Sequence, residues 1–148
     1  MINLNYSINI DSSKEQVWKT MLNNETYQEW AKAFSEGSTF IGEWKKGETL
    51  LFFDPNLGGT RAVLEIFKPY DEILAKHVSM VDKDLKENND NEMAKKWIGS
   101  TERYTFTETG NNTKLDIEIT TDETFTAMFD AGWPKALELI KYLCERKS

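Results

Sequence analysis

The sequence has few of the residues that build covalent or metal-bound frameworks. It holds one cysteine, Cys144, and one histidine, His77, among 148 residues. A single cysteine excludes an internal disulfide, and one histidine excludes a conventional multi-histidine metal site. We therefore expect no metal and no cofactor, and we interpret Cys144 as a small buried hydrophobe.

Long apolar runs and an excess of basic residues are also missing. No stretch approaches the ~20 apolar residues that a membrane-spanning helix needs, so no membrane insertion is expected. The formal net charge is −7, which disfavours nucleic acid and anionic membranes as main partners, because both attract basic surfaces. Residues 1–5 lack the basic and apolar regions of a signal peptide, and we expect a cytoplasmic protein.

What the chain does hold is enough apolar material for one folded unit. Hydrophobic residues make up 39% and aromatic residues 12% of it, and a chain of this length buries a core without covalent staples. No repeat, low-complexity tract or linker interrupts the sequence, so a single domain over 1–148 is expected. The sequence leaves the oligomeric state open, a homodimer included.

Hydrophobic periodicity predicts the order of the elements. Leu4–Ile10 alternates apolar and polar residues, which is typical of a half-buried strand. Two short helices follow: one begins after the capping residues 11–13 and ends at Asn23, and the other spans Glu25–Ala33. Six further strands are predicted at Ser38–Trp44, Glu48–Asp54, Gly59–Phe67, Glu72–Val81, Ser100–Glu108 and Thr113–Thr121.

The segment from Phe125 to Arg146 carries apolar residues at the spacing of a helix that buries one face. Gly132 and Pro134 weaken one of its turns, which predicts a kink or a break at Gly132–Trp133, with Trp133 still facing the sheet. The order β-α-α-β-β-β-β-β-β-α predicts a fold of the α+β class. In it a curved antiparallel sheet wraps around this helix and leaves a cavity between the two.

Five segments resemble a known family: Ile8–Trp18, Tyr27–Trp30, Lys68–Leu74, Thr113–Ile117 and Gly132–Leu137. They are similar to the START-like (SRPBCC) helix-grip superfamily, and most of all to its polyketide-cyclase-like and heat-shock ATPase-activator-like branch. The resemblance implies the helix-grip fold and a cavity for apolar small molecules. A minority of such domains catalyse cyclisation or related reactions, and some act as co-chaperones. The superfamily has no common catalytic residue to carry over.

The expected cavity supplies the candidate site. Its ligand-binding residues are predicted to be Trp30, Phe34, Phe40, Phe52, Leu64, His77, Trp97, Tyr104, Phe129 and Trp133. Taken singly, large apolar side chains are what an ordinary core contains. Taken as a set, stiff aromatic rings can leave space and offer stacking surfaces to a planar or apolar ligand. No catalytic residue and no metal ligand is assigned.

His77 is the polar residue that this cavity would use first. It shares a strand face with Ile73, Ala75 and Ser79, and its unperturbed pKa suits proton transfer near neutrality. The alternative is a hydrogen-bonded core or edge histidine, since no Asp or Ser lies at a spacing that suggests a triad. Glu102 and Arg103 are interpreted as exposed strand residues.

The polar segment Asp82–Lys96 fits neither a strand nor a packed helix, and its acidic residues lack the spacing of a calcium-binding loop. A connection of this length is commonly a lid or a solvated loop. Met93 and Trp97 lie four residues apart and predict one helical turn at its far end. We expect a mobile flap, anchored by Trp97, that gates the cavity.

Three functions are compatible with these patterns. The leading hypothesis is binding of an apolar or aromatic small molecule between the sheet and the C-terminal helix. The first alternative is a cyclase or hydrolase that uses His77, and the second is a co-chaperone-like protein that works through its surface. Polar groups converging in a deep cavity favour the enzyme, an apolar cavity favours binding, and a filled interior with an exposed apolar patch favours a protein partner.

Overall fold

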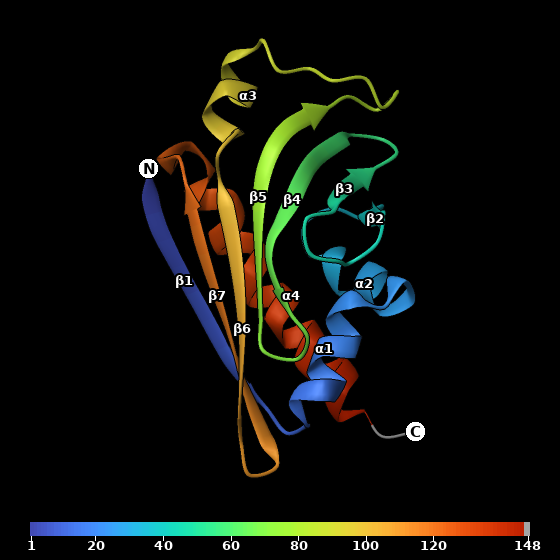
Figure 1. The fold of residues 1–148 in the computed structure, drawn as a ribbon, viewed down its shortest axis with the longest axis vertical. Coiled ribbons are helices and arrows are strands. Elements are labelled where there is room, and N and C mark those ends of the chain that lie inside the picture. Colours follow the sequence, from blue (N-terminus) through green and yellow to red (C-terminus); the bar gives the residue numbers. More distant parts are fainter. Residues whose placement is uncertain (147–148) are drawn as a thin grey trace.

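The computed structural model describes residues 1–146, which form a curved sheet with three helices on its concave side and a short fourth helix beyond one end of the strands (Figure 1). The strands are β1 (Ile2–Ile10), β2 (Thr39–Ile41), β3 (Thr49–Asp54), β4 (Gly58–Lys68), β5 (Glu72–Val81), β6 (Thr101–Thr109) and β7 (Asn112–Thr121). The helices are α1 (Lys14–Leu22), α2 (Asn24–Ala31), α3 (Glu92–Trp97) and α4 (Thr126–Glu145), with a 3-10 turn at Glu123–Phe125.

The sheet confirms the predicted helix-grip topology. Its strand order within the described residues is β1-β7-β6-β5-β4-β3-β2, and every neighbouring pair is antiparallel. Strands β2 to β7 therefore form the expected meander, and β1 joins it by pairing with β7 from Ile2↔Thr121 to Ile10↔Thr113. Between β1 and β2 the chain forms α1 and α2, and Ser13 caps α1 by accepting the backbone N–H of Gln16.

Two local features shape the part of the sheet that faces the cavity. The pairing of β4 with β5 shifts register after Arg61 and after Leu64, and such bulges bend a sheet. At the start of β4, a Cβ on Gly59 would lie 1.9 Å from the carbonyl oxygen of Phe52, so this close approach of two backbones requires glycine. The neighbouring residue, Thr60, is thereby fixed at the inner face.

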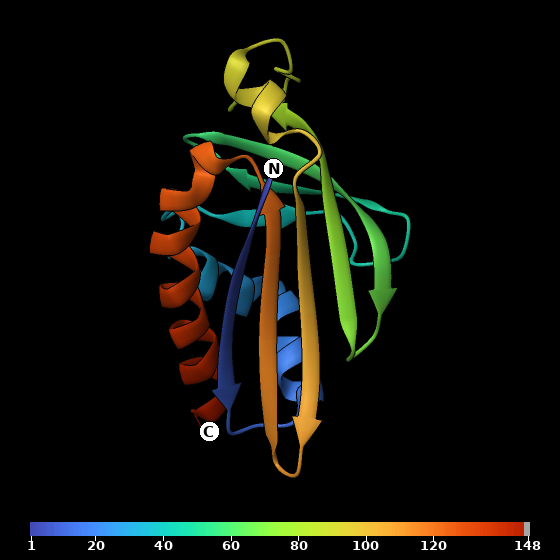
Figure 2. The same ribbon diagram turned by 90° about the vertical axis from the view of Figure 1, so that its left-hand side faces the viewer.

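Helix α4 runs along the sheet beside β1 and packs also against α1 and α2 (Figure 2). Of the predicted kink or break, the break is wrong, because the helix is continuous from Thr126 to Glu145 with Pro134 inside it. The kink stays a prediction. Gly132 instead allows a close approach: a Cβ there would lie 2.3 Å from Cε1 of Phe34. Trp133 is buried and faces the sheet as expected, and its ring contacts Trp30 and Tyr104.

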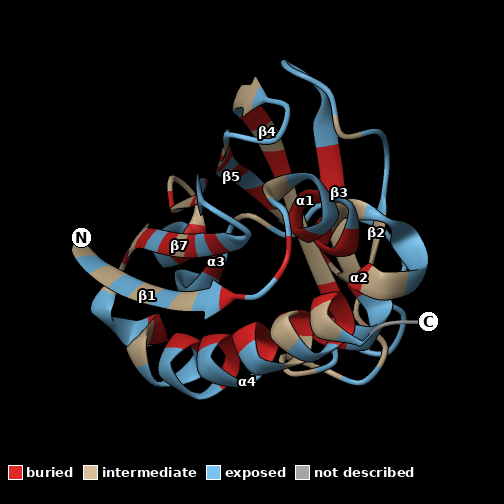
Figure 3. Cartoon of the chain, turned by 90° about the horizontal axis from the view of Figure 1, so that it is seen from below, coloured by how far each residue is buried: buried red, intermediate tan, exposed pale blue. Residues whose placement is uncertain are grey.

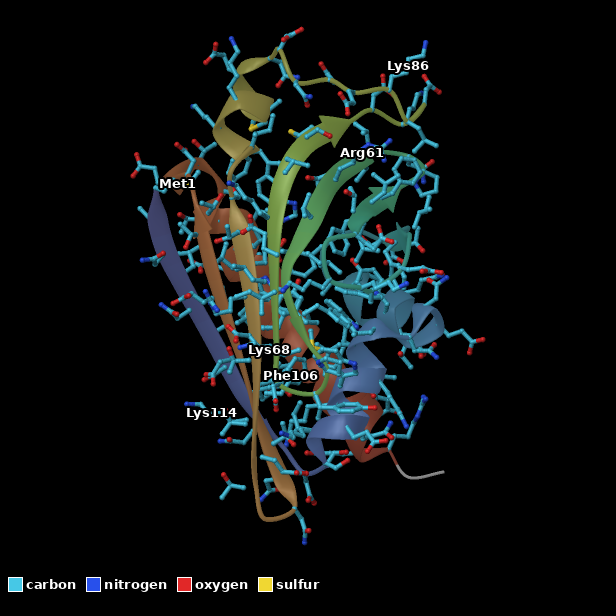
Figure 4. All side chains as sticks on the ribbon, in the orientation of Figure 1. Met1, Arg61, Lys68, Lys86, Phe106 and Lys114 are labelled. Atoms are coloured by element: carbon cyan, nitrogen blue, oxygen red, sulfur yellow. The ribbon has the colours of Figure 1, made fainter. Side chains whose placement is uncertain are left out.

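The buried residues face one another across the space between the sheet and α4 (Figure 3). Near α1 this space is filled, since the ring of Trp18 lies 5.2 Å from those of Phe67 and Phe106. Phe106 is labelled beside α1 in Figure 4. The interior that remains open lies at the other end, next to α2 and the start of α4.

The segment from Asp82 to Lys96 is more ordered than its composition indicates. The carboxylate of Asp82 accepts the backbone N–H groups of Asp84 and Lys86, and the side chain of Asn89 accepts the backbone N–H of Met80. The predicted helical turn is present as α3, but Met93 is exposed and the buried residues are Ala94 and Trp97. Figure 4 shows Lys86 at the outer tip of this segment.

Strand β2 is shorter than the predicted Ser38–Trp44, because Gly42 adopts a φ of +122° directly after it. None of the helices within residues 1–146 is long and apolar enough to cross a membrane.

Candidate functional site

A cavity of about 310 Å³ opens between strands β3 to β6 on one side and α2 and α4 on the other. Eight of the ten residues predicted from the sequence line it: Trp30, Phe34, Phe52, His77, Trp97, Tyr104, Phe129 and Trp133. They come from six elements (α2, β3, β5, α3, β6 and α4) and from the segment after α2, so it is the fold that brings them together.

The other two predicted residues lie elsewhere. Phe40 stands on the short edge strand β2, where its ring packs 5.0 Å from Tyr27 and 5.6 Å from Trp44. Leu64 lies on β4 just before the second register shift and is fully buried in the core. Neither side chain lines the cavity, although Phe40 packs on the lining residue Tyr27.

The apolar wall is built from rings that hold one another in place. Trp30 stacks on Trp133 at 5.7 Å, and Trp97 stacks on Phe129 at 5.9 Å. The ring of Tyr104 meets Trp133 edge-on at 5.7 Å. Contacts of this kind add to the free energy of burial and fix ring orientation. The cavity is therefore held open by mutual packing.

A chain of hydrogen bonds forms the polar wall. The Nε2 atom of His77 lies 2.6 Å from Oε2 of Glu102, and its Nδ1 lies 3.0 Å from the hydroxyl of Thr60. The hydroxyl of Tyr104 donates to Oε1 of Glu102 at 3.2 Å, and the indole N–H of Trp97 donates to Thr60 at 2.8 Å. His77 is only 1% exposed, and the side chain of Glu102 is 13% exposed.

Proton counting limits the states of this cluster. The single hydroxyl proton of Thr60 has two acceptors within reach, Nδ1 of His77 at 3.0 Å and the carbonyl oxygen of Ser79 at 3.1 Å. If Thr60 donates to Nδ1, His77 is neutral and gives its Nε2 proton to Glu102. If Thr60 donates to Ser79, Nδ1 must carry a proton, and a second proton is shared by Nε2 and Glu102. In each state both ring nitrogens are engaged by the protein.

Two phenols stand beside Glu102. Burial, reinforced by the charge of Glu102, raises the pKa of both Tyr27 and Tyr104 well above the ordinary value. Both hydroxyls therefore stay protonated over the physiological range. They give the polar wall neutral hydrogen-bonding groups next to one carboxylate.

Sequence reasoning missed Tyr27, Thr60 and Glu102, all of which line the cavity. The interpretation of Glu102 as an exposed residue is wrong. Glu102 lies two residues before Tyr104 on β6, and residues two apart on a strand share a face. Strand alternation could therefore have shown that Glu102 faces inward. Arg103 points to the outer face, where it forms ion pairs with Glu72 and Glu118.

The cavity reaches solvent beside two apolar residues. Leu57, in the turn before β4, is 72% exposed, and Met128, in the first turns of α4, is 46% exposed, yet both line the cavity. None of residues 82–96 lines it, and Trp97 alone reaches it from that side. The start of the segment nevertheless lies against the opening, since a Cβ on the lining residue Gly58 would lie 3.0 Å from the carbonyl carbon of Asp82. Gating by this segment therefore stays a prediction. Whether the segment is mobile stays a prediction.

A curved antiparallel sheet closed by a long C-terminal helix, with a cavity between them, defines the helix-grip fold. The chain has this fold, and solved structures share it over almost its full length. The Aha1 dimer from Colwellia psychrerythraea has a TM-score of 0.74 at 20% sequence identity, covering 98% of this chain and 97% of that chain.

Two further structures agree. MLL2253 from Mesorhizobium loti has a TM-score of 0.78 at 14% identity, covering 99% of each chain. CalU16 from Micromonospora echinospora has a TM-score of 0.66 at 16% identity, covering 97% of this chain and 74% of that chain. No family model and no curated protein matches the sequence. At these identities the likeness shows the fold alone.

Proposed function

We propose that the protein binds an apolar or aromatic small molecule in this cavity, with a polar group of the ligand directed at Glu102 and Tyr104. The observation that carries the proposal is an open, aromatic-walled space of about 310 Å³ whose hydrogen-bonded polar wall contains Glu102 and Tyr104. This volume is at the lower end of the range typical of ligand pockets, which favours a small ligand. The packed rings pre-form the space, so little ordering is needed on binding.

Acid–base catalysis by His77 is the second candidate, and the 2.6 Å contact between His77 and Glu102 is the observation in its favour. The same geometry argues against it. Both ring nitrogens already face protein partners, Thr60 and Glu102. A general base must lie within hydrogen-bond reach of the proton it takes. His77 would have to leave one of these partners first, so binding is the better-supported function.

A surface role of the co-chaperone kind is less well supported. A protein that works through its surface is expected to have a filled interior, whereas the interior of this protein contains a cavity. The exposed apolar residues Leu57 and Met128 line the cavity mouth, so ligand access accounts for them.

Native mass spectrometry of the protein purified from its own host tests the proposal. We expect a bound small molecule that is lost in Ala31→Phe, which places a ring where Ala31 lines the cavity. Ala131→Phe is the matched control, because Ala131 is exposed on α4 and does not line the cavity. A bound molecule that survives Ala31→Phe in a folded protein would contradict the proposal.

A further inference from the structure

The charges around the cavity are unevenly distributed. Among the described residues that line it, the carboxylates are Asp54 and Glu102, and there is no lysine or arginine. His77 is the one lining residue that can carry a positive charge. The lining is therefore net negative in either protonation state of His77, because two carboxylates face at most one imidazolium.

Asp54 is held as an anion. Its carboxylate accepts the backbone N–H groups of Asn56 at 2.8 Å and Gly37 at 3.2 Å. These hydrogen bonds hold the pKa of Asp54 below its ordinary value. The residue is the last of β3, which forms one side of the cavity, and it lies three residues before the exposed Leu57. The lining thus holds a fixed negative charge in addition to Glu102.

Glu102 is the acceptor that a bound ligand can reach. Each of its oxygens has one protein partner, His77 on Oε2 and Tyr104 on Oε1. A carboxylate oxygen accepts more than one hydrogen bond, so both retain acceptor capacity. The phenols beside it are neutral and add no positive charge.

The rest of the lining suits a cation as well. The faces of aromatic rings carry negative potential and attract ammonium groups, most strongly where water is excluded. Trp30, Trp97 and Trp133 all line the space, and tryptophan is the best of the three aromatic residues for this contact. A ligand carboxylate or phosphate would meet two carboxylates and no basic counter-charge, which opposes its burial.

We infer that the cavity selects small apolar or aromatic amines, with the ammonium group paired to Glu102 and the hydrocarbon part held among the rings. This inference rests on the proposed function and narrows its ligand class. It excludes fatty acids and other anionic amphiphiles as the preferred ligands.

Three probes that share one phenethyl group test it: phenethylamine, phenethyl alcohol and hydrocinnamate, each titrated against tryptophan emission at neutral pH. We expect the amine to bind at least about tenfold more tightly than the alcohol, which corresponds to about 1.4 kcal/mol, and hydrocinnamate to bind most weakly. This series uses the unmodified protein and so does not depend on the folding of a variant.

Glu102→Gln then locates the source of the selection. The variant should lose most of the amine preference while its affinity for the alcohol stays within about twofold. Glu118→Gln removes the same charge from the outer face, where Glu118 pairs with Arg103, and should keep the preference.

The outcomes separate the two proposals. Equal or tighter binding of the alcohol or of hydrocinnamate by the unmodified protein overturns the amine inference and leaves cavity binding standing. A preference that persists in folded Glu102→Gln overturns the assigned role of Glu102. Failure of all three probes to bind contradicts the proposed function itself.

Discussion

At the scale of single residues, His77 acts on the site through Glu102. Its burial and its two hydrogen bonds make it the group that holds this carboxylate at the cavity wall. A buried acceptor that loses its partner retains the desolvation penalty without the compensating bond. The free energy of unfolding should therefore depend on the hydrogen bond between His77 and Glu102.

We expect His77→Ala to lower the free energy of unfolding by about 3 kcal/mol, because Glu102 loses its partner on Oε2 and keeps only the hydrogen bond from Tyr104. Glu102→Gln added to this variant should recover part of the loss, since an amide is easier to bury than a carboxylate. Urea unfolding of the two single variants and the double variant measures the coupling. Additive effects would show that His77 only fills space.

Trp133 offers a second prediction at this scale. Its ring is almost fully buried, and its indole N–H has no hydrogen-bond partner among the described residues. Trp133→Ala should cost about 3–5 kcal/mol by leaving a cavity in the core. Trp133→Phe should cost only about 1 kcal/mol, because no hydrogen bond is lost. Similar losses for both variants, measured by denaturant unfolding, would mean that the indole nitrogen does have a partner.

At the scale of elements, Gly132 sets the distance between α4 and the segment after α2. In Gly132→Ala the new methyl group would lie 2.3 Å from the ring of Phe34, which lines the cavity. We expect the ring to turn into the cavity and weaken phenethylamine binding about tenfold or more. The melting temperature should change little, because alanine stabilises a helix by ~1 kcal/mol relative to glycine and offsets the clash.

The control is Phe34→Ala combined with Gly132→Ala, in which the clash is removed. This double variant should bind phenethylamine more tightly than Gly132→Ala alone. If Gly132→Ala binds the probe as the unmodified protein does, α4 is free to move away from Phe34 and the assigned role of the glycine is wrong.

The turn between β3 and β4 depends on the charge of Asp54. Because hydrogen bonds from Gly37 and Asn56 lower its pKa in the folded state, the unfolded chain takes up the proton at higher pH than the native chain does. The stabilisation is complete above the unfolded pKa of about 3.9 and is lost as pH falls through the lower native value. Asp54→Asn should therefore be less stable near neutrality, with a deficit that narrows in acid.

Thermal unfolding of both proteins from neutral pH to about pH 3 checks this behaviour. A stability difference that stays constant over the whole range would show that the carboxylate charge contributes nothing and that the substitution acts through shape alone.

Strand alternation and helix periodicity were enough to predict the elements of this fold and their order, because both depend on local spacing. They also placed His77 and Tyr104 on inner faces. Alternation also puts Glu102 on the face of Tyr104, but a carboxylate is expected to be exposed unless it is paired, and its partner His77 lies on the neighbouring strand. These patterns also did not show that β2 ends just before Gly42. Phe40 therefore lies on a short edge strand and does not line the cavity. Long-range packing decides these points.

At the scale of the whole molecule, the interior is divided into a filled end and an open end. Trp18, which belongs to α1, packs in the filled end. Trp30, Trp97 and Trp133 line the open end. Trp44 packs on Phe40 and Phe52 and does not line the cavity. The five tryptophans of the chain thus divide by position into three reporters of the cavity and two internal controls.

The most direct measurement of cavity binding is an NMR titration that follows the five indole N–H signals of a ¹⁵N-labelled sample as phenethylamine is added. Saturable shifts are expected for Trp30, Trp97 and Trp133, with Trp18 and Trp44 nearly unchanged. Shifts confined to Trp18 and Trp44, or no saturable shift in any of the five signals, would contradict the binding of small molecules in this cavity.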